Sequence, residues 1–410
     1  MIRYHDLARM FAAVPVTSPP LQRQEAQPAA PLPPTSGARW GKASAFSWSR
    51  EAATSGRNRQ ERLSVGGDSE PRAFMRVVEA EGTFALAERL ATLYVGGGTP
   101  SLLGPAAMEG LAAVLGAHRL AGPELEWTAE ANPESLTAEL AAAWRRAGVN
   151  RLSLGVQSFD HDVLRWMGRL HGPEGGARAV ATARGAGITE LSVDLIFGLP
   201  DEVTRDWDAD LDRALALEAP HLSLYGLTIE PGTALGRAAA EGRTQPVDEG
   251  RYRDEFLRAA ERLASAGYQH YEVSNFALPG HASRHNAVYW GGEPYLGLGN
   301  AAHSYRHPLR RWNLRDWEVY RREAAAGRSP RAEEEILDPD QLRMERVWLG
   351  LRTREGLALE TLTEGARRRA RGWEASGLAR VEGGRLRLTA EGWLLLDRLA
   401  VDLEGDLSAA

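Results

Sequence analysis

The chain has 410 residues, of which 43% are hydrophobic and 25% charged, a balance typical of globular proteins with a sizeable core. Acidic residues outnumber basic ones, 55 to 49, which argues against a general nucleic-acid binder because such proteins present a basic face. The sequence holds no cysteine, which excludes disulfides, thiolate metal sites and cysteine nucleophiles. It also holds no apolar run long enough to span a membrane, so no transmembrane helix is predicted.

The first 70 residues differ in composition from the rest of the chain. Their prolines lie among Ser, Gln, Arg and Gly without a helical or strand period, so we predict a low-complexity, disordered tail. Eight basic against three acidic residues up to position 60 would also suit an organelle transit peptide. Arginine is strongly preferred over lysine, with Lys42 the single lysine, and this bias is typical of a GC-rich bacterial gene. We therefore expect a cytoplasmic protein.

From residue 75 onward, short runs of β-forming residues alternate with amphipathic helical stretches. Strands are predicted at 92–95, 125–129, 151–156, 190–195 and 221–227, with a further one at 270–274. Helices are predicted at 106–115, 136–147, 160–166, 175–186 and 207–217. Strand starts about 26–40 residues apart are typical of βαβ units. The pattern predicts an α/β domain over residues 75–335, with a parallel sheet wrapped into a full or partial (β/α) barrel.

Polar residues and glycines follow the predicted strands. The carboxyl ends of parallel barrel strands open on one face, so these groups should converge on one ligand site. They are Gly96-Gly97-Gly98-Thr99-Pro100, Glu130-Ala131-Asn132-Pro133, Gln157-Ser158, Asp194 and Thr228-Ile229-Glu230. Glycines let backbone N–H groups approach a ligand carboxylate or phosphate, and Glu130 and Asp194 suit an ammonium group or ribose hydroxyls. A glycine run alone is usually a tight turn, and the agreement of five strand ends is what predicts a site.

The motifs at these strand ends also resemble a known family. YVGGGTPS at 94–101, EANP at 130–133, SLGVQSF at 153–159, GRLH at 168–171 and DLIFGLP at 194–200 are similar, in this order, to radical S-adenosylmethionine (SAM) proteins related to oxygen-independent coproporphyrinogen III oxidase. The resemblance implies a radical SAM barrel. It also implies that Gly97, Gly98 and Thr99 hold the methionine end of SAM. The pocket would be completed by Glu130, Gln157, Arg169 and Asp194.

A later motif resembles one branch of that superfamily. HNAVYW at 285–290 is similar to the His-Asn-x-x-Tyr-Trp signature of the HemW-type heme chaperones, which the true oxidases lack, and 296–299 and 303–305 also fit. The resemblance implies a protein that binds heme and passes it to an acceptor protein. Its heme contacts would be His285, Asn286, Tyr289 and Trp290, because imidazole binds iron and aromatic rings pack on the macrocycle. The same residues would equally suit a buried, hydrogen-bonded corner that closes the barrel.

Other histidines allow a rival interpretation. His281 and His285, like His303 and His307, are four residues apart, as in zinc sites on helices, but nearby prolines and glycine make continuous helices doubtful. We therefore expect no protein-bound metal site. Arginines at 310 and 311, beside His307, would suit heme propionates or form a solvated surface patch.

The C-terminal segment, 338–405, is predicted to form a small accessory domain of winged-helix type. Helices are expected at 344–351 and from 357, a hairpin turns at Gly383-Gly384, and Thr389 caps a last helix over 390–399. Glutamates interspersed among its arginines favour packing against the barrel or a protein partner over DNA binding.

The family's defining cysteines are missing. Radical SAM proteins hold a [4Fe–4S] cluster on a Cys-x-x-x-Cys-x-x-Cys loop, and the open iron of the cluster binds SAM. This chain can supply no thiolate, so we expect no cluster and no reductive cleavage of SAM. A reading-frame error near the start and a genuine loss of the cluster both remain open. The competing functions are oxygen-independent coproporphyrinogen III oxidation and an inactive, clusterless homologue.

Overall fold

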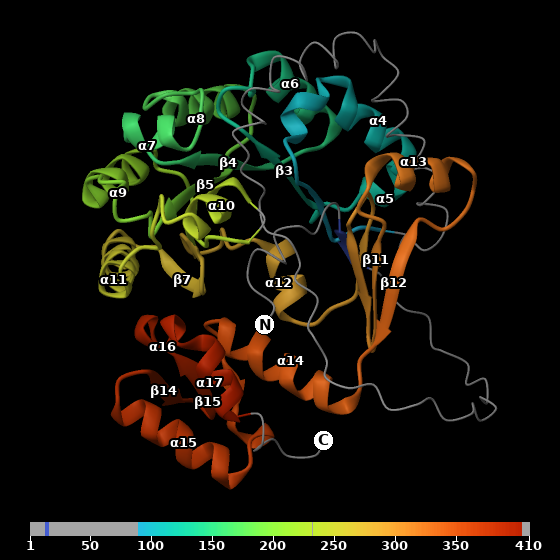
Figure 1. The fold of residues 1–410 in the computed structure, drawn as a ribbon. Coiled ribbons are helices and arrows are strands. Elements are labelled where there is room, and N and C mark those ends of the chain that lie inside the picture. Colours follow the sequence, from blue (N-terminus) through green and yellow to red (C-terminus); the bar gives the residue numbers. More distant parts are fainter. Residues whose placement is uncertain (1–12, 16–88, 232, 404–410) are drawn as a thin grey trace, which may run out of the picture.

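The computed structural model describes residues 13–15, 89–231 and 233–403 (Figure 1). Most of the predicted N-terminal tail therefore lies outside the described residues. Within it, strand β1 (Ala13–Pro15) pairs antiparallel with β9 (Tyr295–Gly297). None of the described helices is long and apolar enough to cross a membrane.

The main sheet confirms the predicted partial barrel. Its strand order is β2-β3-β4-β5-β6-β8-β7, and β2 to β6 run parallel. The strands are β2 (Thr92–Val95), β3 (Glu126–Ala131), β4 (Arg151–Gln157), β5 (Glu190–Phe197), β6 (His221–Gly226), β7 (Gln269–Glu272) and β8 (Asn275–Ala277). The sixth strand predicted at 270–274 corresponds to β7, which ends at Glu272, where a tight turn leads into β8. Because a two-residue turn reverses the chain, β8 joins β6 antiparallel.

Helices cover the outer side of this sheet (Figure 1). They are η1 (Pro100–Leu103), α4 (Ala106–Leu115), α5 (Ala117–Leu120), α6 (Ala138–Ala147), α7 (His161–Trp166), α8 (Gly175–Gly185), α9 (Trp207–Ala216) and α11 (Glu249–Ser265). The short helix α10 (Ala234–Ala240) follows β6 and buries none of its residues. Capping side chains set several helix starts: Thr137 accepts from the backbone N–H of Leu140, and Asp206 from that of Ala209. Trp127 of β3 and Trp144 of α6 are fully buried in the shared core, where each large apolar side chain contributes about 1.5–3 kcal/mol.

A second sheet follows the barrel and was not among the predicted elements. Its order is β1-β9-β10-β11-β12, with every pairing antiparallel. The new elements are α12 (Arg284–Trp290), β10 (His303–Arg306), β11 (Leu309–Asn313), α13 (Trp317–Ala325) and β12 (Arg331–Ile336). Its short strands carry many arginines and glutamates, so they lack the apolar run that marks a buried strand in a sequence.

The C-terminal segment contains the predicted wing. Its elements are α14 (Pro339–Arg352), β13 (Leu357–Ala358), η2 (Leu359–Thr361), α15 (Glu364–Ala375), β14 (Ala379–Glu382), β15 (Arg385–Leu388), α16 (Ala390–Leu394) and α17 (Leu396–Leu403). The hairpin turns at Gly383 and Gly384, both at positive φ, and Thr389 caps α16. The helix predicted from 357 is wrong, because these residues form β13 and η2, and the last helix is divided at Leu395. The domain boundaries at 70 and 335–338 stay predictions.

Candidate functional site

The glycine loop after β2 contacts the end of β3. The backbone N–H of Gly97 donates to Oε2 of Glu130 at 2.8 Å, and the Tyr94 hydroxyl donates to Oε1 at 2.5 Å. A Cβ at Gly96 would lie 2.7 Å from the same Oε1, so this close approach requires glycine. Gly97 and Gly98 both have positive φ, which makes the tight turn possible. The loop ends at Thr99, the residue before η1.

A second group of polar side chains lies at the end of β4. Arg169 Nη1 donates to Oδ1 of Asn132 at 3.0 Å. Gln157 has φ +69°, which is rare for a residue with a side chain and is typical of functional sites. A Cβ at Gly155 would lie 2.9 Å from Nε2 of Gln157 and 3.4 Å from Oδ1 of Asn132, so these side chains surround that glycine.

Two buried polar atoms of this group lack partners. Gln157 Oε1 and Arg169 Nε have no hydrogen-bond partner among the described residues. Burial without a partner costs about 1–3 kcal/mol per polar group, so native proteins seldom leave such atoms unpaired. Both atoms are therefore candidates for contact with a bound ligand.

Asp194 lies on β5, the strand that pairs with β4 on the side away from β3. Its carboxylate accepts from Ser153 Oγ at 2.8 Å and from Ser192 Oγ at 3.0 Å. Burial raises the pKa of Asp194, and burial with the repulsion of Asp194 raises the pKa of Glu130. Burial lowers the pKa of Arg169, while Glu134 and Asp194 oppose that change. Six of the seven predicted SAM residues lie at the carboxyl ends of β2 to β4 or in the segments that follow them. Asp194 does not end its strand as expected, because β5 continues for three more residues, but its charge still acts on Glu130 and Arg169.

Sequence reasoning assigned no role to Tyr94 and counted Asn132 only among the polar residues at the strand ends, although both lie inside the motifs that it used. Tyr94 lies on β2, two residues before the glycine run, and Asn132 follows directly on β3. The available signal was position: polar residues within two positions of a parallel strand's carboxyl end belong to the same site.

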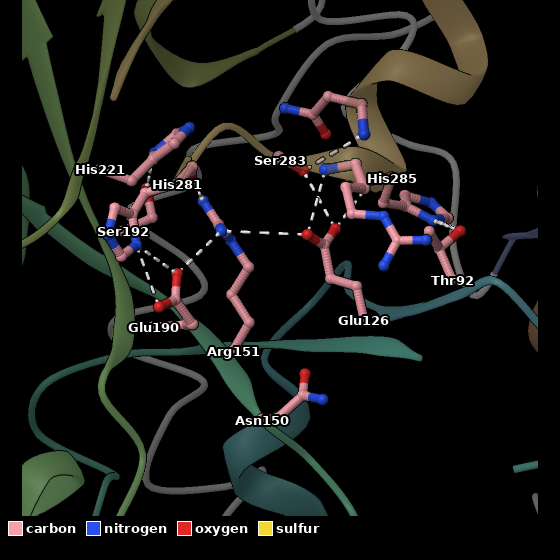
Figure 2. A network of polar contacts seen from close by, with 12 residues as sticks. Thr92, Glu126, Asn150, Arg151, Glu190, Ser192, His221, His281, Ser283 and His285 are labelled. Atoms are coloured by element: carbon pink, nitrogen blue, oxygen red, sulfur yellow. Dashed lines mark hydrogen bonds and ion pairs between the residues drawn. The ribbon is translucent and has the colours of Figure 1, made fainter. Parts of the chain in front are cut away.

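Helix α12, which carries the predicted heme contacts, lies at the opposite end of the strands (Figure 2). His285 Nδ1 is 2.8 Å from Oγ1 of Thr92, the first residue of β2. Glu126, the first residue of β3, accepts from the backbone N–H groups of Arg284 at 3.0 Å and His285 at 2.8 Å. Ser283 caps the helix. The helix is therefore anchored at the amino ends of the strands.

Arg151 joins this anchor to the next strands. Its guanidinium lies 3.9 Å from Glu126 and 3.6 Å from Glu190, which begin β3 and β5, and donates to the His281 carbonyl at 3.0 Å (Figure 2). His281 Nδ1 in turn lies 2.9 Å from Oε2 of Glu190. Residues 281–285 thus lie across the amino ends of the parallel strands.

The His285 ring is enclosed. Nδ1 contacts Thr92, Nε2 lies 2.7 Å from the Tyr289 hydroxyl, and the ring stacks on Tyr94 at a centroid distance of 5.1 Å. Burial lowers the pKa of His285 to about 3, so the imidazole is neutral at physiological pH. Trp290 packs under the Arg352 guanidinium, 4.3 Å from its ring centroid. This geometry matches the buried-corner alternative. Heme contact by His285, Asn286, Tyr289 and Trp290 stays a prediction.

A small cavity lies inside the barrel between the two ends. It measures about 80 Å³ and is lined from both sides, by Tyr94 and Glu130 and by His285, Tyr289 and Trp290. Pockets for drug-sized ligands usually measure roughly 300–1,000 Å³. Helix α12 lines this cavity through His285, Asn286, Tyr289 and Trp290. Among the described residues, no group of three or more His, Cys, Asp or Glu side chains is placed to hold a metal ion.

Comparison with known proteins agrees with this architecture. Residues 64–214 match the radical SAM superfamily. The heme chaperone HemW of Mycobacterium tuberculosis is 39% identical over 314 residues, covering 77% of this chain and 80% of that protein. HemW of Escherichia coli is 41% identical over 220 residues, or 54% of this chain and 57% of that protein. The E. coli coproporphyrinogen III oxidase HemN, a radical SAM enzyme, shares the fold with a TM-score of 0.66 at 21% identity, covering 82% of this chain and 83% of that one. The chain belongs to the HemW family of radical SAM proteins.

Proposed function

We propose that this protein is a heme chaperone that binds heme and passes it to an acceptor protein. The names of its HemW relatives support the proposal. The observation that carries it is the small size of the cavity between the predicted SAM residues and α12, which measures about 80 Å³ and is lined by Glu130, His285 and Trp290 among others. A porphyrinogen substrate would need far more room there. The small cavity disfavours the coproporphyrinogen oxidase alternative, because an oxidase must hold its tetrapyrrole substrate next to SAM. A heme chaperone does not need to bind its tetrapyrrole there.

SAM is the second ligand in this proposal, at the carboxyl ends of β2 to β5. Two observations support the fit of SAM to this pocket. Gln157 Oε1 and Arg169 Nε are buried without a hydrogen-bond partner among the described residues, and a Cβ at Gly96 or Gly155 would clash with neighbouring side chains. The backbone at Gly97, Gly98 and Thr99 would receive the methionine end. The carboxylates of Glu130 and Asp194 would bind the ammonium group or ribose hydroxyls, because both are acceptors placed inside the barrel. When bound, SAM supplies a sulfonium centre and an adenosyl group to this pocket.

The [4Fe–4S] cluster of the wider family does not fit this chain. Cluster iron is held by thiolates, and the 410 residues include no cysteine. The proposed chaperone activity therefore involves no radical step. Cytoplasmic location is part of the proposal, by analogy with the bacterial relatives.

A heme titration tests the proposal directly. The full chain is titrated with ferric heme, and the Soret band is followed. Loaded protein is then mixed with apomyoglobin as a heme acceptor, and transfer is read from the myoglobin spectrum. We expect saturable heme binding, transfer, and no turnover of coproporphyrinogen III in the presence of SAM and a reductant. Turnover would favour the oxidase. Unchanged melting temperature with excess heme or SAM would favour the inactive homologue.

A further inference from the structure

A histidine binds heme iron only through a ring nitrogen that the ligand can reach and that carries no other hydrogen bond. The chain has ten histidines, and all but His5 lie in the described residues. Most of them are engaged: the buried or stacked His171, His221, His270, His285 and His303, and the carboxylate-paired His161 and His281. The remaining two, His118 and His307, are exposed. His161 is exposed as well, but the Asp162 carboxylate lies 3.2 Å from its Nδ1 and would repel an anionic ligand.

His307 lies at the tip of the β10–β11 hairpin. Its Nδ1 is 3.4 Å from the Tyr305 hydroxyl, and its Nε2 has no hydrogen-bond partner among the described residues. The turn is short, because Arg306 pairs with Leu309 directly across it. The free nitrogen therefore belongs to an exposed ring on a tight, sheet-supported turn.

Two arginines beside His307 are unpaired. Arg306 and Arg311 form no ion pair with any described residue, and strand alternation places Arg306, Leu309 and Arg311 on one face of the sheet. Arg310 faces the other side, where it pairs with Glu345 of α14. The arginines without an ion pair are thus 306 and 311, and this changes the pair considered from the sequence. Glu334 lies opposite Arg311 on the same face, but its carboxylate pairs with Arg331.

The same face carries exposed apolar surface. Leu309 pairs with Ile336 of β12, and Ile336 is 73% exposed, which is unusual for a large apolar side chain. Arg306, Leu309 and Ile336 form one row across the three strands. An apolar strip with two cations and an imidazole at its edge matches a planar apolar ring with two carboxylates and an iron ion.

We infer that this face of the β10–β11–β12 sheet is where the protein carries heme. His307 would ligate the iron, Leu309 and Ile336 would contact the macrocycle, and Arg306 and Arg311 would pair with the propionates. The inference rests on the proposed heme-chaperone function and assigns its site. An exposed site with one protein ligand leaves the second face of the iron open to an acceptor, which suits a protein that must release its cargo.

The test compares single-residue variants in the full chain. Ferric heme is titrated into wild type, His307→Ala, His118→Ala and His285→Ala, and the Soret band gives affinity and ligation. His118→Ala is the matched control, because His118 is also exposed, whereas its neighbour Arg119 donates to the Leu115 carbonyl of its own helix end. We expect His307→Ala to weaken heme binding by about tenfold or more and to shift the Soret band. His118→Ala should match wild type.

Iron-free protoporphyrin IX separates the contributions of the imidazole and the arginines. His307→Ala should leave its binding unchanged, since it has no iron, whereas Arg306→Gln with Arg311→Gln should weaken binding of both protoporphyrin IX and heme. Circular dichroism and melting temperature confirm that these exposed substitutions leave the fold intact. Wild-type affinity in His307→Ala, with loss in His285→Ala, would overturn this site and place heme at α12. Absence of heme binding in wild type would instead overturn the proposed function.

Discussion

The Tyr94 hydroxyl donates to Glu130 at 2.5 Å while its ring stacks on His285, so this tyrosine joins the two ends of the barrel. On one side lies the predicted SAM pocket, and on the other lies helix α12. A substitution or a ligand at either end that moves Tyr94 would alter its hydrogen bond to the buried Glu130 carboxylate. A hydrogen bond to a charged group contributes about 1.5–3 kcal/mol to stability.

Tyr94→Phe should weaken SAM binding and change its pH dependence. The hydrogen bond from Tyr94 lowers the pKa of Glu130, opposing the larger effect of burial, so its loss raises that pKa further. If the carboxylate form binds SAM, affinity falls as pH drops through the Glu130 pKa, and the fall begins at higher pH in the variant. Calorimetric titration with SAM across the weakly acidic range measures this. The control, Tyr268→Phe, also removes a buried hydroxyl donor, to Ala219 O at 2.5 Å, but should leave SAM binding unchanged. Equal effects of the two substitutions would contradict a specific role for Tyr94.

Gly96→Ala should also reduce SAM affinity. The added Cβ would meet Glu130 Oε1 at 2.7 Å and the Tyr94 ring at 2.4 Å, so the carboxylate must move. Gly185→Ala provides the comparison, because a Cβ there meets nothing within 4 Å at the end of α8. SAM titration of both variants distinguishes a local clash from a general effect of replacing glycine. Unaltered affinity in Gly96→Ala would show that Glu130 does not contact the ligand.

His285→Gln should make stability less dependent on pH. The folded-state pKa of about 3 lies below the ordinary value of 6.5, so the unfolded chain binds the proton more readily than the folded one. The histidine therefore destabilises the fold progressively as pH falls from about 6.5 toward 3, by at most about 1.4 kcal/mol per pH unit. Urea unfolding at neutral and acidic pH, with His118→Gln as control, measures the difference between variant and wild type. An unchanged pH dependence in His285→Gln would mean that this histidine is not buried in the neutral form.

Arg151→Met should destabilise the protein strongly. It leaves the buried Glu126 carboxylate without its cation, and removing one partner of a buried pair costs about 3–5 kcal/mol. Arg146→Met breaks a comparable pair with Glu109 on the surface, where both side chains are at least half exposed, and should cost about 0–1 kcal/mol. Denaturant unfolding of both variants tests the difference. A similar loss of stability in the two variants would show that the position of segment 281–285 does not depend on Arg151.

Incubation with ferrous iron and sulfide under reducing conditions should produce no [4Fe–4S] cluster on this chain. Thiolates are the ligands for cluster iron, and the sequence has none. Absorption spectroscopy and iron analysis after desalting give the result, and dithionite with SAM should release no 5′-deoxyadenosine. A stable cluster would require ligands of another chemical type and would reopen the radical alternative.

The parallel half of the fold was predictable because its signals are local. Each strand from β2 to β6 is a short run of β-forming residues, and most of the polar motifs follow their strands directly, as Gly96 follows β2 and Gln157 ends β4. Parallel topology then brings the motifs together without further information. The β9–β12 sheet escaped prediction, because strands such as β12 expose most of their charged side chains and show no apolar period.

The amino-acid sequence by itself determined the chemistry of the strand ends and the absence of any thiolate, because both depend only on residue type and on spacing along one strand. Only the tertiary structure decided that His285 meets Thr92, 193 residues away, and that α12 lies at the amino ends of the strands. Periodicity reports whether a residue is buried, but not against which distant strand it packs. The two ring nitrogens of His285 are therefore committed by contacts that no local pattern encodes.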